Sequence, residues 1–244
     1  MQPLELYIHI PFCVKKCAYC DFLSGPAGEK EKEEYVKMLV DEIRNCPDTV
    51  QNYRVISIFF GGGTPSLLTG EQIGRLMDTV REIFTLDEDA EITMEMNPGT
   101  VTEEKLRKYR QAGVNRLSIG LQSVNDEELR LLGRIHTYEE FREAYHLARA
   151  NGFSNINVDL ISAIPGQTVE SWRRTLEQVM ALFPEHISAY SLILEEGTTF
   201  YKKYVEDEAK EGPKLPDEDA ERQMYWDTET LMEKNGYHRY EISN

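Results

Sequence analysis

The chain has 244 residues, a formal net charge of −16 and hydrophobic residues at 41 % of its positions. This length fits one large domain or one and a half average ones, with the composition of a globular protein. A surface of this sign repels polyanions, and no large Lys/Arg cluster opposes it, so we expect no nucleic-acid partner.

The chain shows no pattern that would direct it into or across a membrane. No apolar run approaches the roughly 18–20 residues that a spanning helix needs, and the first ten residues lack the features of a signal peptide. We therefore expect a cytoplasmic protein without a transmembrane segment. Three of its four cysteines are clustered, and in a reducing compartment such a cluster indicates a metal site rather than disulfides.

Short apolar runs alternate with amphipathic stretches along most of the chain. The runs rich in strand-favouring residues lie at 4–10, 55–60, 91–96, 116–121, 156–164 and 187–194. Apolar residues at helical spacing predict core-facing helices within 33–44, 71–84 and 169–183. Strands separated by helical crossovers form parallel sheets, so we predict an α/β fold, a partial (β/α)6 barrel of the TIM type. The pattern alone leaves an open doubly wound sheet as an alternative.

The last part of the chain differs in composition from the preceding units. Residues 204–223 are dense in charge and read as a connector, followed by a helix at about 217–235 and by "YEISN", which resembles the start of a further strand. We therefore divide the chain into a core barrel over residues 1–200 and, over 201–244, a charged connector, a helix and the start of a C-terminal extension.

The stretch "YIHIPFCVKKCAYCDF" places Cys13, Cys17 and Cys20 in a loop after the first strand. In parallel α/β folds, ligand sites lie where strands end, so this loop belongs to a functional rim. A structural zinc site has four ligands, so His9 would have to serve as the fourth ligand beside the three cysteines. Three unliganded buried thiols are a second possibility. An iron–sulfur cluster fits better, because three thiolates leave one iron of a cubane open for a small molecule.

Further polar or glycine-rich positions follow the later strands. The turn "FFGGGTPSLL" (59–68) allows close approach of its backbone to a ligand, although it could equally be a tight strand-to-helix turn. Glu95 is a carboxylate inside an apolar strand, and Gln122 and Asp159 occupy what we take as comparable strand ends. Arg134 lies in a loop before a helix. Each residue alone could be structural, but together they predict a shared ligand-binding rim.

The C-x3-C-x2-C spacing resembles the radical S-adenosylmethionine (radical SAM) superfamily, in which SAM chelates the open iron and is cleaved to a 5′-deoxyadenosyl radical. The strings "YIHIPFC", "GGGTPSLL", "MNPGT", "RLSIGLQS", "LGRIHT", "DLISAIPGQT" and "YEISN" resemble oxygen-independent coproporphyrinogen III oxidase and its relatives. The resemblance implies a 4Fe-4S cluster on the three cysteines and a first SAM site at Tyr7, Tyr19, Gly62 and Glu95. It also implies a second SAM or substrate site at Gly63, Thr64, Gln122, Arg134 and Asp159.

Phe22 separates two branches of this family. The oxidase branch usually carries a further cysteine two residues after the third, whereas phenylalanine there is similar to the HemW haem chaperones. The resemblance therefore implies a protein that binds haem and delivers it to respiratory proteins. It also implies an electron donor such as a flavodoxin or ferredoxin. The alternatives are an oxidase that decarboxylates propionates of a porphyrinogen and another radical SAM activity on an unknown substrate. Family members continue past "YEISN" into an accessory C-terminal domain, which we expect to be absent from this chain.

Overall fold

The computed structural model describes residues 1–207 and 211–242, and over these residues six parallel strands alternate with helices. The strands are β1 (Gln2–Ile10), β2 (Tyr53–Gly62), β3 (Thr85–Met96), β4 (Arg116–Gln122), β5 (Ile156–Ser162) and β6 (His186–Ser191). Their order in the sheet is β1-β2-β3-β4-β5-β6. Sequential order in a parallel sheet requires a crossover after every strand. The predicted α/β partial barrel is thus confirmed.

The helices lie mainly in these crossovers. They are α1 (Glu29–Arg44), α2 (Gly70–Ile83), α3 (Glu103–Ala112), α4 (Asp126–Leu132), α5 (Tyr138–Ala150), α6 (Val169–Met180), α7 (Thr199–Tyr201), a π-helical turn η4 (Lys202–Glu206) and α8 (Glu218–Lys234). Shorter 3-10 turns occupy η1 (Asp48–Asn52), η2 (Pro65–Leu67) and η3 (Pro98–Thr100). Several of these helices begin at a residue whose side chain caps the first backbone N–H groups. Thr69, for example, accepts a hydrogen bond from the backbone N–H of Gln72 and is part of a capping box.

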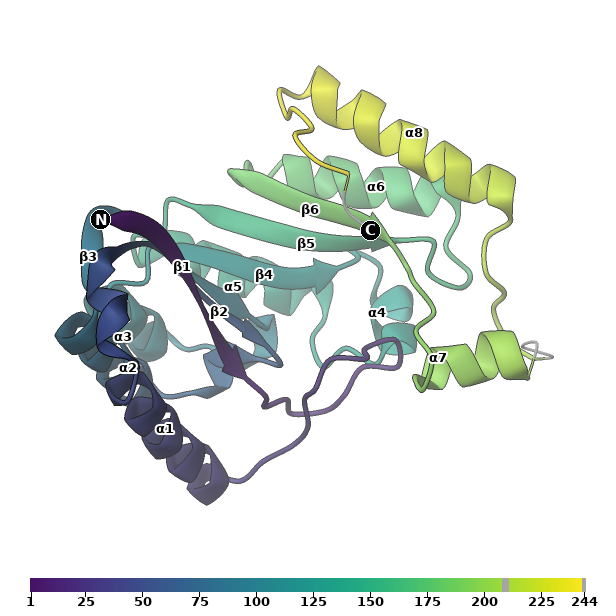
Figure 1. The fold of residues 1–244 in the computed structure, drawn as a ribbon. Helices are drawn as coiled ribbons and strands as arrows, with labels where there is room; N and C mark the ends of the chain where they lie inside the picture. Colours follow the sequence, from purple (N-terminus) through teal and green to yellow (C-terminus); the bar gives the residue numbers. More distant parts are fainter. Residues whose placement is uncertain (208–210, 243–244) are drawn as a thin grey trace. The chain divides into compact units, whose positions relative to one another are not determined.

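The chain forms two compact units. The first unit comprises Met1–Val14, Leu23–Ser118 and Glu143–Asn155, and the second comprises Lys15–Phe22, Ile119–Arg142 and Ile156–Asn244. In the first unit, α1, α2 and α3 lie next to one another beside β1–β3 (Figure 1). The inward side chains of α1 and α2 include the apolar stripes predicted for these two segments. Ile73, Leu76, Met77 and Val80 of α2, for example, are fully buried. Burial of such a stripe is the main stabilisation of a surface helix.

In the second unit, β5 and β6 pair in parallel, and α6 and α8 lie side by side (Figure 1). A separate apolar cluster joins α4, the end of β5 and the α7 turn, built from Leu132, Ile161, Ile164, Phe200 and Tyr204. Ala18 and Tyr19 of the cysteine loop pack against this cluster. The second unit therefore holds its part of the loop through apolar contacts as well as hydrogen bonds.

The C-terminal segment is partly as predicted. The helix expected at 217–235 is α8, with Asp217 as its N-cap. The strand expected at "YEISN" is not formed at Tyr240–Ile242, and the last two residues lie outside the described part. The segment is held by side chains in place of a strand ladder. The Tyr237 hydroxyl donates to the Pro184 carbonyl oxygen at 2.8 Å. The connector before α8 also begins later than predicted, because 204–206 are helical.

Trp172 fixes α8 to α6 within the second unit. Its side chain is fully buried, and its Nε1–H donates to the Met224 carbonyl oxygen at 3.1 Å and to Thr228 Oγ1 at 2.9 Å. Replacing it with phenylalanine removes both hydrogen bonds and leaves unfilled volume. We expect Trp172→Phe to lower the free energy of unfolding by about 1–3 kcal/mol, measured by urea denaturation followed by circular dichroism.

Trp226 on α8 supplies the matched control, because its side chain is 54 % exposed. Trp226→Phe should change the free energy of unfolding by less than about 0.5 kcal/mol. Equal effects of the two substitutions would show that Trp172 does not anchor α8.

Candidate functional site

The cysteine loop is divided between the two units. Cys13 belongs to the first unit, where its backbone N–H donates to the Gly25 carbonyl oxygen at 2.9 Å and its Sγ accepts from the Thr64 hydroxyl at 3.6 Å. Cys17 and Cys20 belong to the second unit. None of the three takes part in a disulfide bond. Neither unit alone brings together three His, Cys, Asp or Glu side chains as a metal site among the described residues. The three-thiolate site therefore stays a prediction.

In the first unit, the turn after β2 requires glycine at two successive positions. Gly62 has a φ of +112°, and a Cβ there would lie 2.4 Å from the His9 ring. A Cβ on Gly63 would lie 2.7 Å from the Phe12 carbonyl oxygen. Any side chain would thus collide with the end of β1 or the start of the cysteine loop. The triple glycine is a site of close backbone approach, as the sequence predicts.

Glu95 at the end of β3 contacts this turn directly. The Gly62 N–H donates to Glu95 Oε2 at 3.0 Å across the β2–β3 pair. Burial raises the pKa of Tyr7, and the negative charge of Glu95 raises it further. The structure therefore brings together three of the predicted SAM residues, Tyr7, Gly62 and Glu95, where β1, β2 and β3 end.

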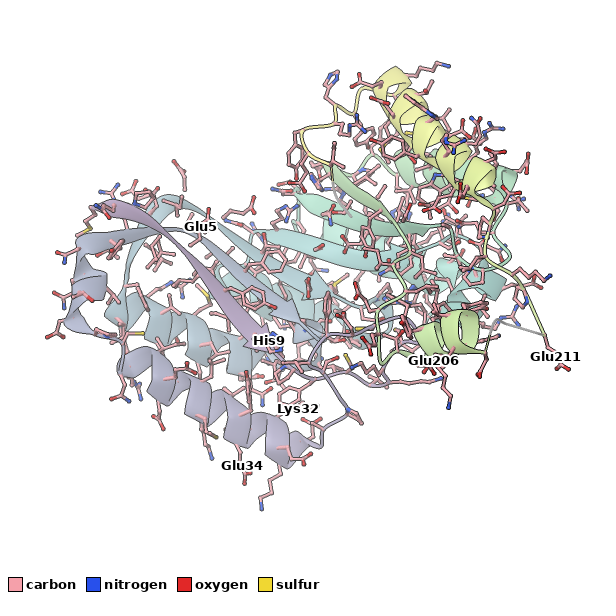
Figure 2. The ribbon with its side chains drawn as sticks, turned by 45° about the vertical axis from the view of Figure 1, so that its right-hand side comes forward. Glu5, His9, Lys32, Glu34, Glu206 and Glu211 are labelled. Atoms are coloured by element: carbon pink, nitrogen blue, oxygen red, sulfur yellow. The ribbon has the colours of Figure 1, made fainter. Side chains whose placement is uncertain are left out.

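His9 is engaged on both ring nitrogens. Its Nδ1 lies 3.1 Å from the Tyr7 hydroxyl, and its Nε2 lies 3.1 Å from the Leu23 carbonyl oxygen. Figure 2 shows His9 at the end of β1. Because a carbonyl oxygen only accepts hydrogen bonds, Nε2 carries the proton and Nδ1 accepts from the Tyr7 hydroxyl, so these two contacts fix the orientation of the ring.

Two residues of α3 hold the segment that follows the glycines, and the sequence interpretation missed them. The Lys105 Nζ donates to the carbonyl oxygens of Ser66 at 2.8 Å and Thr100 at 3.1 Å, and the Tyr109 hydroxyl donates to the Leu68 carbonyl oxygen at 2.6 Å. Burial lowers the pKa of Lys105, with the charge of Lys32 adding to the effect. Their spacing of four residues puts them on one face of the helix, but such a pair is too common in sequences to indicate this role.

In the second unit, Arg134 joins the cysteine loop to β4. Its Nη2–H donates to the Gly120 carbonyl oxygen at 2.6 Å, and its Nη1–H points to Cys17 Sγ at 3.8 Å. The adjacent loop is tied by the backbone, because the Ala18 N–H donates to the Leu132 carbonyl oxygen at 2.9 Å. Burial raises the pKa of Tyr19, against the opposing charge of Arg134. Three of the predicted residues, Cys17, Tyr19 and Arg134, are thus neighbours.

Buried polar atoms beside this arginine lack partners among the described residues. Gln122 Oε1 and Arg134 Nε are both buried without a hydrogen bond. Gln122 also has a φ of 76°, a left-handed conformation that is uncommon for a side-chain-bearing residue. Unpaired buried polar groups are costly and recur at ligand sites. These residues of the second unit fit a small polar ligand with donors and acceptors, such as SAM.

Asp159 does not occupy the predicted position. It lies in the middle of β5, three residues before the strand ends at Ser162, and its Oδ1 accepts a hydrogen bond from Asn157 Nδ2 at 2.7 Å. The expectation that Asp159 occupies a strand end comparable to that of Gln122 is therefore wrong. Arg134 lies, as predicted, in a loop before a helix, between α4 and α5. The whole run "INVDLIS" is strand, so its only charged residue falls inside it.

A buried carboxylate fastens the end of β4 to α6. Glu128 is 5 % exposed and accepts hydrogen bonds from Ser123 Oγ at 2.6 Å, Gln167 Nε2 at 2.9 Å and Ser171 Oγ at 2.5 Å. A buried charge is tolerated only with such partners. Glu128 thereby steadies the backbone next to Gln122, although nothing in the sequence distinguishes it from the exposed acidic residues of α4.

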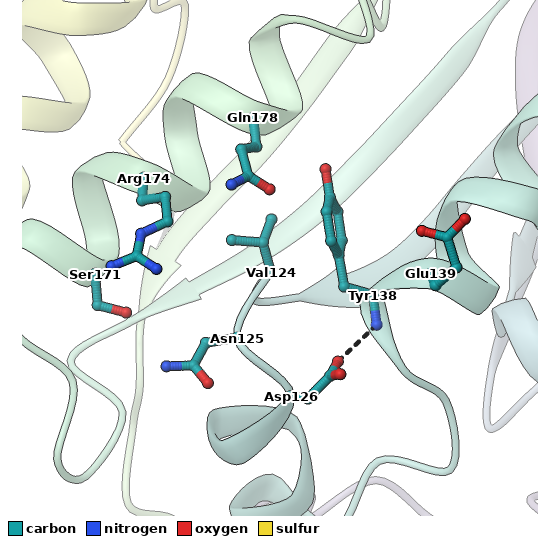
Figure 3. A pocket seen from close by; sticks show the side chains of 8 residues that line it. All are labelled: Val124, Asn125, Asp126, Tyr138, Glu139, Ser171, Arg174 and Gln178. Atoms are coloured by element: carbon teal, nitrogen blue, oxygen red, sulfur yellow. Dashed lines mark hydrogen bonds between the residues drawn. The ribbon is translucent and has the colours of Figure 1, made fainter.

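A cavity of about 390 Å³ also lies in the second unit, between the start of α4, the start of α5 and one side of α6. Its lining is Val124, Asn125, Asp126, Tyr138, Glu139, Ser171, Arg174 and Gln178 (Figure 3). None of the residues predicted for the cluster or for SAM belongs to this lining.

No helix in the described part of the chain is long and apolar enough to span a membrane.

Comparison with known proteins gives a consistent picture. A sequence model of the radical SAM superfamily matches residues 7–179. "Heme chaperone HemW" of Escherichia coli is 43 % identical over 100 % of this chain and 62 % of its own length. The same-named protein of Bacillus subtilis is 38 % identical over 98 % of this chain and 62 % of its length. The chain therefore spans less than two thirds of these relatives.

Solved structures show the same architecture. The coproporphyrinogen III oxidase HemN of Escherichia coli, described as a radical SAM enzyme, has a TM-score of 0.87 and 33 % identity over 97 % of this chain and 54 % of its own. The archaeal Elp3 of Methanocaldococcus infernus has a TM-score of 0.63 at 16 % identity, over 95 % of this chain and 55 % of its own, and supports the fold alone.

His136 gives a pH prediction for the second unit. Burial lowers its pKa to about 3, with the charge of Arg134 adding to the shift and the Leu121 backbone opposing it. Below about pH 6.5 the unfolded chain binds a proton that the folded chain refuses, so stability falls as the pH drops from there toward about 3. The slope from this group reaches at most about 1.4 kcal/mol per pH unit.

His136→Gln removes this contribution. Urea unfolding between pH 4 and pH 7 should therefore show a shallower loss of stability toward acid in the variant than in the wild type. Parallel curves for the two proteins would mean that His136 is protonated equally in the folded and unfolded states.

Proposed function

Because the chain belongs to the radical SAM superfamily, which implies a 4Fe-4S cluster and SAM, we propose that Cys13, Cys17 and Cys20 bind the cluster and leave one iron open. The spacing of the three thiols within one loop supports this assignment. With both groups bound, the site supplies one-electron reductive cleavage of SAM.

The remaining site residues are proposed to hold SAM in two positions. At the first, the Gly62 backbone, the Glu95 carboxylate and the rings of Tyr7 and Tyr19 contact the molecule. Glu95 would accept hydrogen bonds from hydroxyl groups while its contact with Gly62 keeps the turn in place. The residues proposed for the second SAM or substrate position are Gly63, Thr64, Gln122, Arg134 and Asp159.

For the whole protein we favour a haem chaperone of the HemW type. The observation that supports it most is the 43 % identity to the Escherichia coli HemW along the entire chain. Phe22 agrees with it, since it stands two residues after Cys20, where the oxidase branch carries another cysteine, and its ring is exposed. The likeness to HemN supports the second candidate, a coproporphyrinogen III oxidase.

The proposed role implies partners and a division of the chain. Residues 1–200 would be the radical SAM core, and residues 201–244 would be the connector, helix and beginning of an extension. A flavodoxin or ferredoxin would supply the electron, and respiratory proteins would receive the haem.

The cluster is tested by anaerobic reconstitution of the chain followed by iron and sulfide analysis. We expect about four of each per chain, as for one 4Fe-4S cluster. Cys17→Ala should lose the cluster, whereas Cys46→Ala, which changes the one cysteine outside the motif, should keep it. One tightly bound zinc ion and no iron would contradict the assignment.

Glu95→Gln tests the SAM site. It keeps the side chain's shape but removes the charge, so hydrogen bonds to SAM should weaken by about 1.5–3 kcal/mol, which calorimetry on the reconstituted protein would detect. Glu91→Gln on the same strand is the control, because Glu91 is exposed and bonds to Thr93. Unchanged SAM affinity in Glu95→Gln would make Glu95 a residue that only supports the turn.

One assay separates the two candidate functions. The reconstituted protein is incubated with SAM, a reductant and coproporphyrinogen III, and in parallel it is titrated with haem. We expect haem binding, seen as a shifted Soret band, and no loss of propionate carboxylates. Decarboxylated product formed in repeated turnovers would establish the oxidase and reject the chaperone.

A further inference from the structure

The cavity of about 390 Å³ in the second unit plays no part in the proposed cluster and SAM sites. It lies between the start of α4, the start of α5 and one side of α6, and all of its lining residues belong to this one unit. Val124 is the only aliphatic residue among the eight that line it. The volume falls within the roughly 300–1,000 Å³ of small-molecule sites, and the polar lining suits a polar ligand.

The α6 side of the cavity presents a positive charge that has no partner. Ser171, Arg174 and Gln178 lie on one face of this helix, and Figure 3 shows all three extending from it toward the cavity. Within residues 1–207 and 211–242, the Arg174 guanidinium and the Gln178 amide form no hydrogen bond or ion pair. A guanidinium offers five N–H donors in a planar fork that matches a carboxylate or phosphate group. This side of the cavity is therefore suited to an anion.

The opposite side of the cavity, at the starts of α4 and α5, offers hydrogen-bond acceptors. The Tyr138 N–H donates to Asp126 Oδ1 at 2.8 Å (Figure 3), whereas Asp126 Oδ2 has no hydrogen-bond partner in the described part of the chain. Glu139 is paired with Arg142 at 2.9 Å, so its charge is balanced. The Tyr138 hydroxyl likewise has no partner among the described residues, and its ring stacks with that of Phe141, with centroids 6.1 Å apart. Ionised carboxylates only accept hydrogen bonds, so this side is suited to hydroxyl groups.

We propose that this cavity binds a small hydroxylated anion of the sugar-phosphate class. Arg174 and Gln178 donate hydrogen bonds to the phosphate group, and Asp126 accepts hydrogen bonds from the hydroxyl groups. The Tyr138 hydroxyl can donate or accept between the two ends. A neutral sugar would leave the Arg174 charge without a partner, and an anion without hydroxyl groups would leave Asp126 Oδ2 without one. The site is separate from haem carriage and from the cluster, and it does not depend on either.

The test is isothermal titration calorimetry of the full 244-residue chain with glucose 6-phosphate as the probe. Because Arg174 is exposed, Arg174→Gln should leave the fold intact and weaken binding at least tenfold. Asp126→Asn keeps an oxygen for the Tyr138 N–H but replaces the free acceptor with an NH₂ group. It should weaken binding of glucose 6-phosphate several-fold without weakening binding of inorganic phosphate. Arg107→Gln is the matched control, because it removes one exposed arginine from α3 in the first unit and should leave the affinity unchanged.

Two fragments of the probe separate the contributions of its groups. Glucose lacks the anion and inorganic phosphate lacks the hydroxyl groups, so each should bind at least tenfold more weakly than glucose 6-phosphate. Inorganic phosphate that binds as tightly as the sugar phosphate would show a simple anion site and overturn the assignment. Binding that is unchanged in Arg174→Gln would place the ligand elsewhere and overturn it as well. No heat of binding at millimolar glucose 6-phosphate would show that water alone fills the cavity, and each of these three results would leave the haem-carrier function intact.

Discussion

The hydrogen bond from the Gly62 N–H to the Glu95 carboxylate is the contact on which the first unit's part of the site depends. Gly62, the last residue of β2, has a φ of +112°, a conformation that favours glycine, and a side chain there would collide with the His9 ring. The carboxylate that accepts from Gly62 also brings a negative charge beside Tyr7, and the next residue, Gly63, lies close to the backbone of Phe12. Lys105 and Tyr109 then fix the carbonyl groups that follow. A flexible-looking glycine run is thereby held in one conformation.

In the second unit, the positive charge of Arg134 organises the part of the site around Cys17. Arg134 is buried, and its guanidinium is oriented by the Gly120 carbonyl oxygen, so that its other N–H group reaches Cys17. A thiolate is stabilised by a neighbouring cation, as is any anionic group held there. Arg134 Nε and Gln122 Oε1 have no hydrogen-bond partner within residues 1–207 and 211–242, and burying a polar atom unpaired costs free energy. Such a cost is reasonable where a polar ligand supplies the missing partners.

The order of strands and helices could be predicted from the sequence, because the spacing of apolar residues shows which side chains face the core. The sequence also indicated the turn of three glycines after β2 and the loop that contains Arg134, because in both places the residue types themselves favour a turn or loop. It could not indicate Glu128, Lys105 or the position of Asp159 within β5. Those depend on contacts between residues far apart in the chain, such as Glu128 with Gln167 and Ser171. The strand expected at "YEISN" was an error of the same kind, since an apolar run forms a strand only beside a partner, and Tyr237 and Tyr240 are held by side-chain contacts instead.

Asp159 shows how one contact can change the interpretation of a residue. Read from the sequence, it is a lone carboxylate in an apolar strand and therefore a candidate for binding a ligand. In the structure its Oδ1 accepts from the Asn157 amide, and that amide in turn orients the His186 ring. The carboxylate is thus engaged by a neighbour on its own strand, and the side chain that reaches across to β6 is the neutral amide of Asn157. An isolated charge in an apolar sequence therefore indicates a buried polar contact at least as readily as a ligand site.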